Sequence, residues 1–229
     1  MEMKKLILLP YAGSLGIAYT KWSKVLSERF ELYRVDYNRL YPGKNYYEPS
    51  SWNELVELLM KKVQSITTDG NYIIYGHSMG VRMAAVIYYE MKKKGLPLPE
   101  KLILSGCRLL SEKTKNPDEE GKEKFRKEYI EMGGISEEVL ANDELAELTF
   151  EALEKDIRLL SQYNYENYKT KIECPVSILN GSKDTISTKE DWEELLGIPV
   201  EYHVYEGKHF FIYEHEKEIL EYLSGHAGK

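Results

Sequence analysis

Short apolar runs alternate along the chain with longer segments in which apolar and charged residues are mixed. Six runs are nearly uninterrupted, which is typical of strands in a parallel sheet that helices cover on both faces. We predict these strands at residues 5–9, 32–36, 72–75, 101–105, 176–180 and 200–205. Helices are predicted between or after them, at residues 20–30, 51–66, 79–94, 188–196 and 214–223. The alternation predicts an α/β fold with a doubly wound, mainly parallel sheet and right-handed crossovers.

One interval, between the fourth and fifth predicted strands, is much longer than an ordinary crossover. It is helical and highly charged at residues 116–132, 136–140 and 143–161, with breaks at Gly133-Gly134 and Ala141-Asn142. An insertion here leaves the sheet at the carboxyl ends of its strands, where ligands bind in such folds. We therefore expect a helical lid at about residues 108–170 within a single domain, residues 1–229. The alternative is an insertion that has no role in binding.

Composition narrows the class of protein. The longest apolar runs, such as Leu6-Ile7-Leu8-Leu9, are too short to cross a membrane, and the first is too short for a secretory signal. With only Cys107 and Cys174, the default is a cytoplasmic protein with reduced thiols that does not act in a membrane. The net charge of −7 disfavours nucleic acid as a partner, because phosphate binding needs a basic surface.

The candidate chemistry starts at Gly76-His77-Ser78-Met79-Gly80, between the third predicted strand and the helix that follows it. Gly-x-Ser-x-Gly in this strand–turn–helix context is the nucleophile elbow of an α/β-hydrolase. The turn is so tight that the positions two before and two after the serine must lack a side chain, which the glycines satisfy. We therefore expect the α/β-hydrolase fold, with Ser78 as the nucleophile.

A serine nucleophile needs a base, and the base needs a carboxylate that orients it. In this fold the acid and then the histidine follow the serine along the chain. Asp184 follows the fifth predicted strand and is the expected acid, whereas Asp156 in the lid and Asp36 after the second strand are alternatives. His209 lies in a glycine-containing turn after the last strand and is the expected base. The less suitable histidines are His77 in the elbow, His203 in a strand, His215 in the final helix and His226 near the end of the chain.

Acyl transfer also needs two N–H donors that face the developing oxyanion. We expect them to be the backbone amides of Met79, directly after the nucleophile, and of Ala12, in the loop after the first strand. That loop could instead be a plain turn, and a phosphate loop is disfavoured because no Gly-Lys-Ser/Thr follows it. The histidines and the two cysteines are too scattered for a metal site, so we expect neither a metal nor a cofactor.

Four motifs together resemble the type II (external, editing) thioesterases that accompany non-ribosomal peptide and polyketide synthetases. They are Leu9-Pro10-Tyr11-Ala12-Gly13, Tyr41-Pro42-Gly43, the elbow, and Gly207-Lys208-His209-Phe210-Phe211. The lid pattern from Met132 to Asp156 and the later Trp192 are also similar, so that the resemblance runs from about residue 5 to 223.

The resemblance implies a serine enzyme that removes mis-primed or stalled acyl groups from the phosphopantetheine arm of a carrier protein. Its partners would be acyl or peptidyl carrier protein domains of a synthetase, it would need no cofactor of its own, and we expect a monomer. Carried onto this chain, the triad is Ser78, Asp184 and His209, and the oxyanion hole is formed by the amides of Ala12 and Met79.

Three positions depart from the family pattern. None of them is a catalytic residue, so the departures concern which substrate fits more than whether the enzyme is active. Ser14 stands where a glycine is common, Val81 where a small residue is common, and Thr185 where a proline is common. Other functions remain open. They are a fatty-acyl-carrier thioesterase that releases fatty acids, a carboxylesterase for small esters, and a non-catalytic module that uses a hydrolase fold.

The lid also carries a cluster of basic residues that could dock an acidic carrier protein. They are Lys113, Lys115, Lys122, Lys124, Arg126 and Lys127. The alternative, which we favour, is a solvated helix face on which lysines alternate with glutamates.

Overall fold

The computed structural model describes residues 3–15, 17–35, 37, 48–184 and 187–227. Three sequence predictions lie outside these residues: the Tyr41-Pro42-Gly43 motif, the alternative acid Asp36, and the departure at Thr185. Within the described part of the chain, no helix has both the length and the apolar character needed to cross a membrane.

Six strands form one sheet in which every pair of neighbours is parallel, in the order β2-β1-β3-β4-β5-β6. The strands are β1 Lys5–Leu9, β2 Glu31–Arg34, β3 Tyr72–His77, β4 Lys101–Ser105, β5 Val176–Gly181 and β6 Val200–Tyr205. Those between the two edge strands β2 and β6 are buried along their whole length, which explains their uninterrupted apolar sequences. The predicted α/β class and parallel sheet are confirmed.

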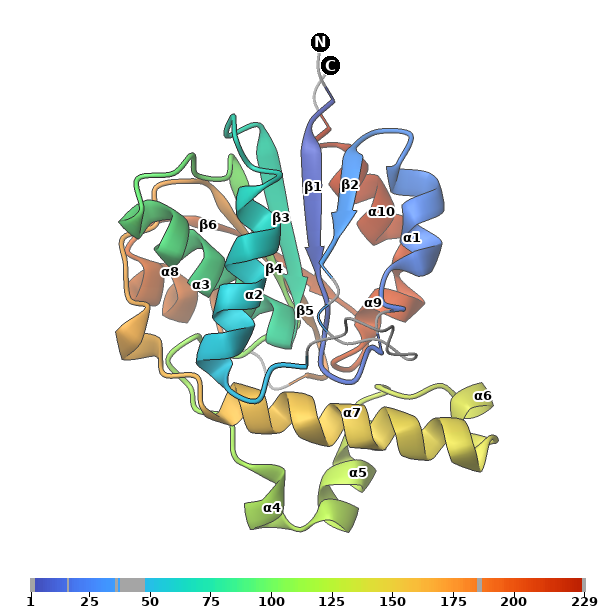
Figure 1. The fold of residues 1–229 in the computed structure, drawn as a ribbon. Coiled ribbons are helices and arrows are strands. Elements are labelled where there is room, and N and C mark those ends of the chain that lie inside the picture. The colour runs from blue at the N-terminus through green and yellow to red at the C-terminus, as the bar shows by residue number, and fades with distance from the viewer. Residues whose placement is uncertain (1–2, 16, 36, 38–47, 185–186, 228–229) are drawn as a thin grey trace.

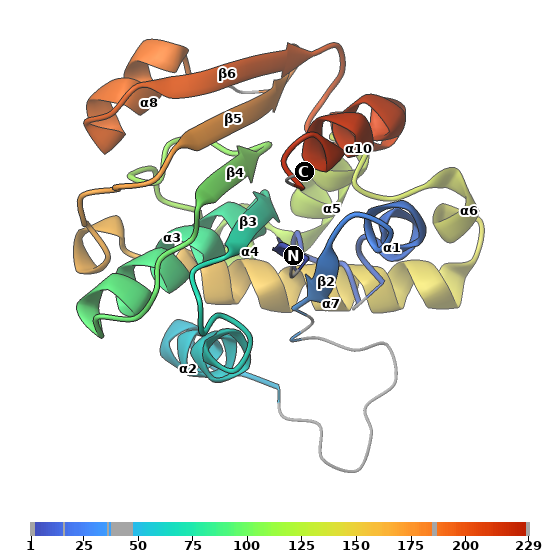
Figure 2. The same cartoon turned by 90° about the horizontal axis from the view of Figure 1, so that it is seen from above.

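Helices cover both faces of this sheet (Figures 1 and 2). On one face α2 Trp52–Gln64 packs beside α3 Met79–Lys93, and on the other α1 Thr20–Leu26 packs beside α10 Glu216–Ser224. Helix α8 Lys189–Leu196 joins β5 to β6. In α2, the Ser51 side chain accepts a hydrogen bond from the Glu54 amide and caps the first turn, and an apolar stripe that includes Leu55, Leu59 and Val63 faces the sheet.

Two predicted helices are divided in the structure. The segment predicted as 214–223 is two helices, α9 Phe211–Glu214 and α10, and His215 lies at the junction between them, not inside a helix. The segment predicted as 116–132 is also two helices, α4 Pro117–Glu120 and α5 Lys122–Glu131. Gly121 separates them with φ of 86°, a conformation that interrupts a right-handed helix and that glycine adopts without strain.

Four helices lie between β4 and β5, namely α4, α5, α6 Glu137–Leu140 and α7 Asp143–Ser161. Helix α7 runs across the carboxyl ends of the strands, with α4 and α5 on its other side and α6 near one end (Figure 1). A short 3-10 helix, Tyr165–Asn167, follows on the way to β5. The insertion therefore covers the edge of the sheet at which α/β folds place their ligands.

Ion pairs connect the helices of this insertion. The buried Glu154 carboxylate on α7 lies 3.1 Å from Lys122 Nζ, 3.0 Å from an Arg126 nitrogen and 3.6 Å from an Arg158 nitrogen. Arg126 also donates two hydrogen bonds to Glu147. Lys124 and Lys127 pair with glutamates one turn further along α5. Four of the six basic residues that could dock a carrier are thus engaged inside the insertion, which favours the structural interpretation of that cluster.

Candidate active site

The turn between β3 and α3 holds Ser78 in a strained conformation, with φ of 55° and ψ of −114°. Few residues other than glycine adopt a positive φ, and such strain persists only where the surroundings impose it. Here the Ser78 N–H donates to the Ser105 carbonyl at 2.8 Å, and the Ser78 carbonyl accepts from the Val81 amide at 3.0 Å. The side chain is half-buried at the start of α3.

The glycines on either side of Ser78 are required by close backbone contacts. A Cβ atom at Gly76 would lie 2.3 Å from the Gly80 carbonyl oxygen, and one at Gly80 would lie 2.4 Å from the Leu9 carbonyl oxygen. The turn therefore packs directly on the end of β1, and this contact brings the loop that starts at Pro10 up to the nucleophile elbow.

Asp184 and His209 are joined by a hydrogen bond of 2.7 Å between Asp184 Oδ2 and His209 Nδ1. The two loops that carry them, after β5 and after β6, are in contact, because a Cβ atom at Gly181 would lie 2.2 Å from the Lys208 carbonyl oxygen. Both side chains are mostly buried. With Nδ1 bonded to the carboxylate, His209 presents Nε2 as the atom that can accept a proton from a substrate or a nucleophile.

His77 packs against His209, with 5.2 Å between the ring centroids. It is fully buried, and its Nδ1 is 3.0 Å from Ser105 Oγ. Burial lowers the pKa of His77 well below its usual range, so this ring is neutral at neutral pH. Because His77 precedes Ser78, the contact also places His209 beside the elbow. Within the described part of the chain, no hydrogen bond joins the Ser78 hydroxyl to His209, which is bonded to Asp184. Such catalytic hydrogen bonds are often long in the free enzyme and shorten only when substrate is bound.

The other histidines lie away from this pair. His203 on β6 packs against Tyr222, His226 lies near Lys101, and His215 connects Glu218 to the Glu206 carbonyl. Among the described residues, no group of three histidine, cysteine, aspartate or glutamate side chains could hold a metal ion.

Asp156, the alternative acid on α7 of the insertion, bonds to the backbone instead of to a histidine. Its Oδ2 accepts a hydrogen bond of 2.7 Å from the Gly13 N–H, and the side chain is buried. Burial raises the pKa of Asp156 to about 7, although hydrogen bonds from Gly13 and Tyr37 act in the opposite direction. This carboxylate therefore belongs to the contact between α7 and the loop after β1.

The loop after β1 carries Ala12, one of the two expected oxyanion donors, and Met79 follows Ser78. Neither amide donates a hydrogen bond to a described residue, as the oxyanion-hole hypothesis requires. The Ala12 carbonyl accepts a hydrogen bond of 2.9 Å from the Tyr129 hydroxyl on α5. Gly13 has φ of 75°, and a Cβ atom there would lie 3.1 Å from Leu153 Cβ on α7.

Phe210, next to His209, lies in a cluster of aromatic rings that the sequence patterns do not reveal. Phe210 packs against His209, Tyr11 and Tyr129, with centroid distances of 5.1, 5.2 and 5.6 Å. The Tyr213 hydroxyl donates to that of Tyr11 at 2.6 Å. The one sequence signal for this packing is Gly134, where a Cβ atom would lie 2.5 Å from the Tyr129 ring.

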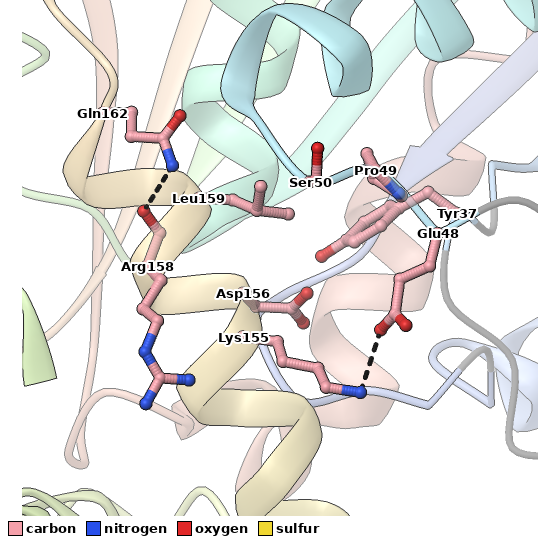
Figure 3. A pocket seen from close by; sticks show the side chains of 9 residues that line it. All are labelled: Tyr37, Glu48, Pro49, Ser50, Lys155, Asp156, Arg158, Leu159 and Gln162. Carbon is pink, nitrogen blue, oxygen red and sulfur yellow. Dashed lines mark hydrogen bonds and ion pairs between the residues drawn. The ribbon is translucent and has the colours of Figure 1, made fainter.

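A hollow of about 320 Å³ lies between α7 and the start of α2 (Figure 3). Lys155 pairs with Glu48 across it at 3.2 Å. It is lined by Tyr37, Glu48, Pro49, Ser50, Lys155, Asp156, Arg158, Leu159 and Gln162. None of Ser78, Asp184 and His209 lines it, so the catalytic geometry and not this hollow identifies the candidate active site.

Comparison with known proteins agrees with the geometry. A family model described as a thioesterase domain matches residues 4–226. AngT, a probable anguibactin biosynthesis thioesterase of Vibrio anguillarum, is 29% identical over 94% of this chain and 88% of AngT. The gramicidin S biosynthesis protein GrsT of Aneurinibacillus migulanus is 25% identical over 96% of this chain and 87% of GrsT. The crystal structure of ClbQ, from the colibactin NRPS/PKS pathway, matches 96% of this chain and 95% of ClbQ with a TM-score of 0.81 and 25% identity.

Proposed function

This chain belongs to the thioesterase domain family, and we propose that it hydrolyses acyl thioesters carried on the phosphopantetheine arm of a carrier protein. The observation that carries the proposal is the Asp184–His209 hydrogen bond beside the strained elbow at Ser78. AngT and GrsT are named for the biosynthesis of anguibactin and gramicidin S, and ClbQ for the colibactin NRPS/PKS pathway, which supports a carrier protein of such a pathway as the partner.

In the proposed reaction, Ser78 Oγ attacks the thioester carbonyl while His209 Nε2 takes its proton. The oxyanion that forms accepts hydrogen bonds from the Ala12 and Met79 amides. The carbon–sulfur bond then breaks, and His209 returns the proton to the departing pantetheine sulfur. Water then gives a proton to the same nitrogen as it attacks the ester carbonyl; the bond between that carbon and Ser78 Oγ breaks, His209 returns the proton to Oγ, and the acid is released. Asp184 holds the Nδ1–H of His209 and stabilises the imidazolium in both steps.

His77 contributes to this mechanism by remaining neutral. A second positive charge 5.2 Å from His209 would oppose formation of the imidazolium. Because burial keeps the His77 ring uncharged, its packing adds no positive charge beside His209, whereas the Asp184 carboxylate can stabilise the imidazolium. Gly106 permits this packing, since a Cβ atom there would lie 2.3 Å from the His77 ring.

We also propose that the helices of the insertion, within residues 108–170, act as the lid of this site. The support is direct contact, because Tyr129 and Asp156 on two of these helices bond to the backbone of Ala12 and Gly13. The basic residues of α5 are engaged in ion pairs, so we assign them to lid structure and not to carrier docking.

The test compares three substrates: an acyl-loaded carrier protein, an acyl thioester of N-acetylcysteamine, and a p-nitrophenyl ester of the same acid. We expect kcat/KM to be highest for the acyl carrier protein, and Ser78→Ala to abolish turnover of all three. A preference for the simple ester over both thioesters would refute the proposal and indicate a carboxylesterase. Fatty-acyl release, the nearest alternative, would appear as a preference for long acyl chains on a fatty-acid carrier.

A further inference from the structure

Two buried lid side chains hold a single peptide group of the loop after β1, the one that joins Ala12 to Gly13. Tyr129 on α5 donates its hydroxyl to the Ala12 carbonyl at 2.9 Å, and Asp156 on α7 accepts the Gly13 N–H at 2.7 Å. A peptide group has one donor and one acceptor, so both of its polar atoms are occupied. Both side chains are shielded from solvent, with exposed fractions of 8% for Tyr129 and 2% for Asp156.

The helix that carries Asp156 also packs against the backbone at this point. A Cβ atom at Gly13 would lie 3.1 Å from Leu153 Cβ, so α7 approaches the loop as closely as a glycine permits. Gly134, at the end of the turn after α5, leaves room for the Tyr129 ring. The two hydrogen bonds are therefore part of a packed contact between the lid and the loop.

The residues before Ala12 are held by contacts with the body of the domain. The Tyr11 hydroxyl bonds to Tyr213, and its ring packs against Phe210. The elbow packs on the chain just before, through the contact of Gly80 with the Leu9 and Pro10 carbonyls. The domain thus holds the Tyr11 side chain and the chain before it, and the lid holds the Ala12–Gly13 peptide, so the Ala12 N–H lies between two restrained points.

We propose that Tyr129 and Asp156 are positioning residues for hydrolysis: they fix the Ala12–Gly13 peptide so that the Ala12 N–H faces the oxyanion. Docking of α5 and α7 then completes the oxyanion hole, and the lid acts on the chemical step as well as on access. This inference rests on the proposed function, because it takes the Ala12 amide as an oxyanion donor. An oxyanion-hole donor that is held in place in advance stabilises the transition state more than the bound substrate.

The test uses Tyr129→Phe, which removes only the hydroxyl, and Asp156→Ala, which removes the acceptor for Gly13. Asp156→Asn should rescue, because it retains an acceptor oxygen at that position. Tyr163→Phe is the matched control, since Tyr163 is also buried but its hydroxyl makes no hydrogen bond to a described residue. Should Asp156→Ala not fold, Tyr129→Phe decides the question alone.

For each variant we would measure kcat and KM with an acyl N-acetylcysteamine thioester, and binding of two inhibitors by calorimetry. One is an alkyl trifluoromethyl ketone, which forms a tetrahedral adduct with a serine, and the other is the thioether analogue of the substrate. We expect Tyr129→Phe and Asp156→Ala to lower kcat about tenfold, less than the loss of a whole donor. KM and thioether affinity should stay within about twofold of the wild type, while ketone affinity falls in parallel with kcat.

Unchanged kcat and ketone affinity in Tyr129→Phe would overturn the inference. Equal losses of ketone and thioether affinity would also overturn it, because they would show that these residues shape the pocket and do not orient the oxyanion donor. If the wild-type enzyme hydrolysed no thioester, the proposed function would fail instead. Ketone binding to Ser78 would then still report on the oxyanion hole.

Discussion

The buried Asp156 carboxylate should make the stability of this protein depend on pH in a way that Asp156→Asn abolishes. Burial raises its pKa from the ordinary 3.8 to about 7, the nearby Glu48 carboxylate adds to the effect, and Gly13, Tyr37 and Lys155 oppose it. Figure 3 shows this group on α7 between Lys155 and Tyr37. Between pH 4 and 7 the unfolded chain loses this proton whereas the folded chain keeps it, so stability falls as pH rises through that window.

The magnitude follows from the two pKa values. A difference of about three pH units corresponds to about 4 kcal/mol in the free energy of unfolding, and about 2 to 3 kcal/mol of this falls between pH 5 and pH 8. Asparagine keeps an acceptor for the Gly13 N–H but has no proton to lose. The stability of Asp156→Asn minus that of the wild type should therefore rise by that amount from pH 5 to pH 8 and level off above about pH 7.

The assay is urea unfolding, followed by tryptophan fluorescence at pH 5, 6, 7 and 8 at constant ionic strength. Asp69 supplies the control, because its hydrogen bond from Lys5 lowers its pKa and leaves it ionised in both states above pH 5. Asp69→Asn should thus show a difference from the wild type that stays constant between pH 5 and pH 8. A constant difference for Asp156→Asn as well would refute the assignment of a raised pKa to this buried carboxylate.

Three further predictions concern the triad, the elbow and the lid. Asp184→Asn should keep the fold but lower kcat by about four orders of magnitude, because the His209 ring is no longer held in the tautomer that leaves Nε2 free to accept a proton. If Asp184→Asn lowered kcat less than Asp156→Asn does, Asp156 in the lid would be the catalytic acid. Gly80→Ala should lower the free energy of unfolding by about 3 kcal/mol or more in urea titrations, since its methyl group would lie 2.4 Å from the Leu9 carbonyl oxygen; a shift below about 1 kcal/mol would mean that the elbow relaxes. Charge reversal of the lid lysines Lys122, Lys124 and Lys127 should change kcat/KM for an acyl carrier protein and for a small thioester by the same factor. A loss of kcat/KM on the carrier protein alone, strongest at low salt, would instead indicate that these lysines dock the carrier.

All six predicted strands exist, and three of them, β1, β4 and the edge strand β6, have the predicted bounds. Their ends are marked in the sequence by charged residues, glycine or proline: Lys4 and Pro10 flank β1, Glu100 and Gly106 flank β4, and Glu206-Gly207 follows β6. The bounds of β2, β3 and β5 differ from the predicted ones by one or two residues. The breaks at Gly121 and His215 were missed for different reasons. Gly121 lies in a charged segment, where a single glycine in the sequence does not show whether a helix bends or ends. His215 follows a helix of only four residues, which is too short to give a periodic pattern of its own.

Some residues of the candidate site can be predicted from the sequence, and others cannot. Chain order and local turn chemistry predict Asp184 and His209, because each lies in a turn after one of the last two strands, and the structure joins the two side chains by a hydrogen bond. The roles of Tyr129 and His77 depend on what packs against them, and no local pattern carries that information. A buried tyrosine on a charged helix and a histidine inside a motif give no sign in sequence of the backbone or ring they contact.

The contact between the lid and the Ala12–Gly13 peptide also has a consequence for how the enzyme matures. Its two hydrogen bonds join residues 117 and 143 positions apart along the chain. Contacts of such long sequence separation close large loops, whose entropy cost must be met before the contacts stabilise the fold. A chain that has assembled its sheet but has not yet docked α5 and α7 would thus lack a formed oxyanion hole. Hydrolytic competence should therefore appear only once the lid has docked, and not as soon as the sheet has formed.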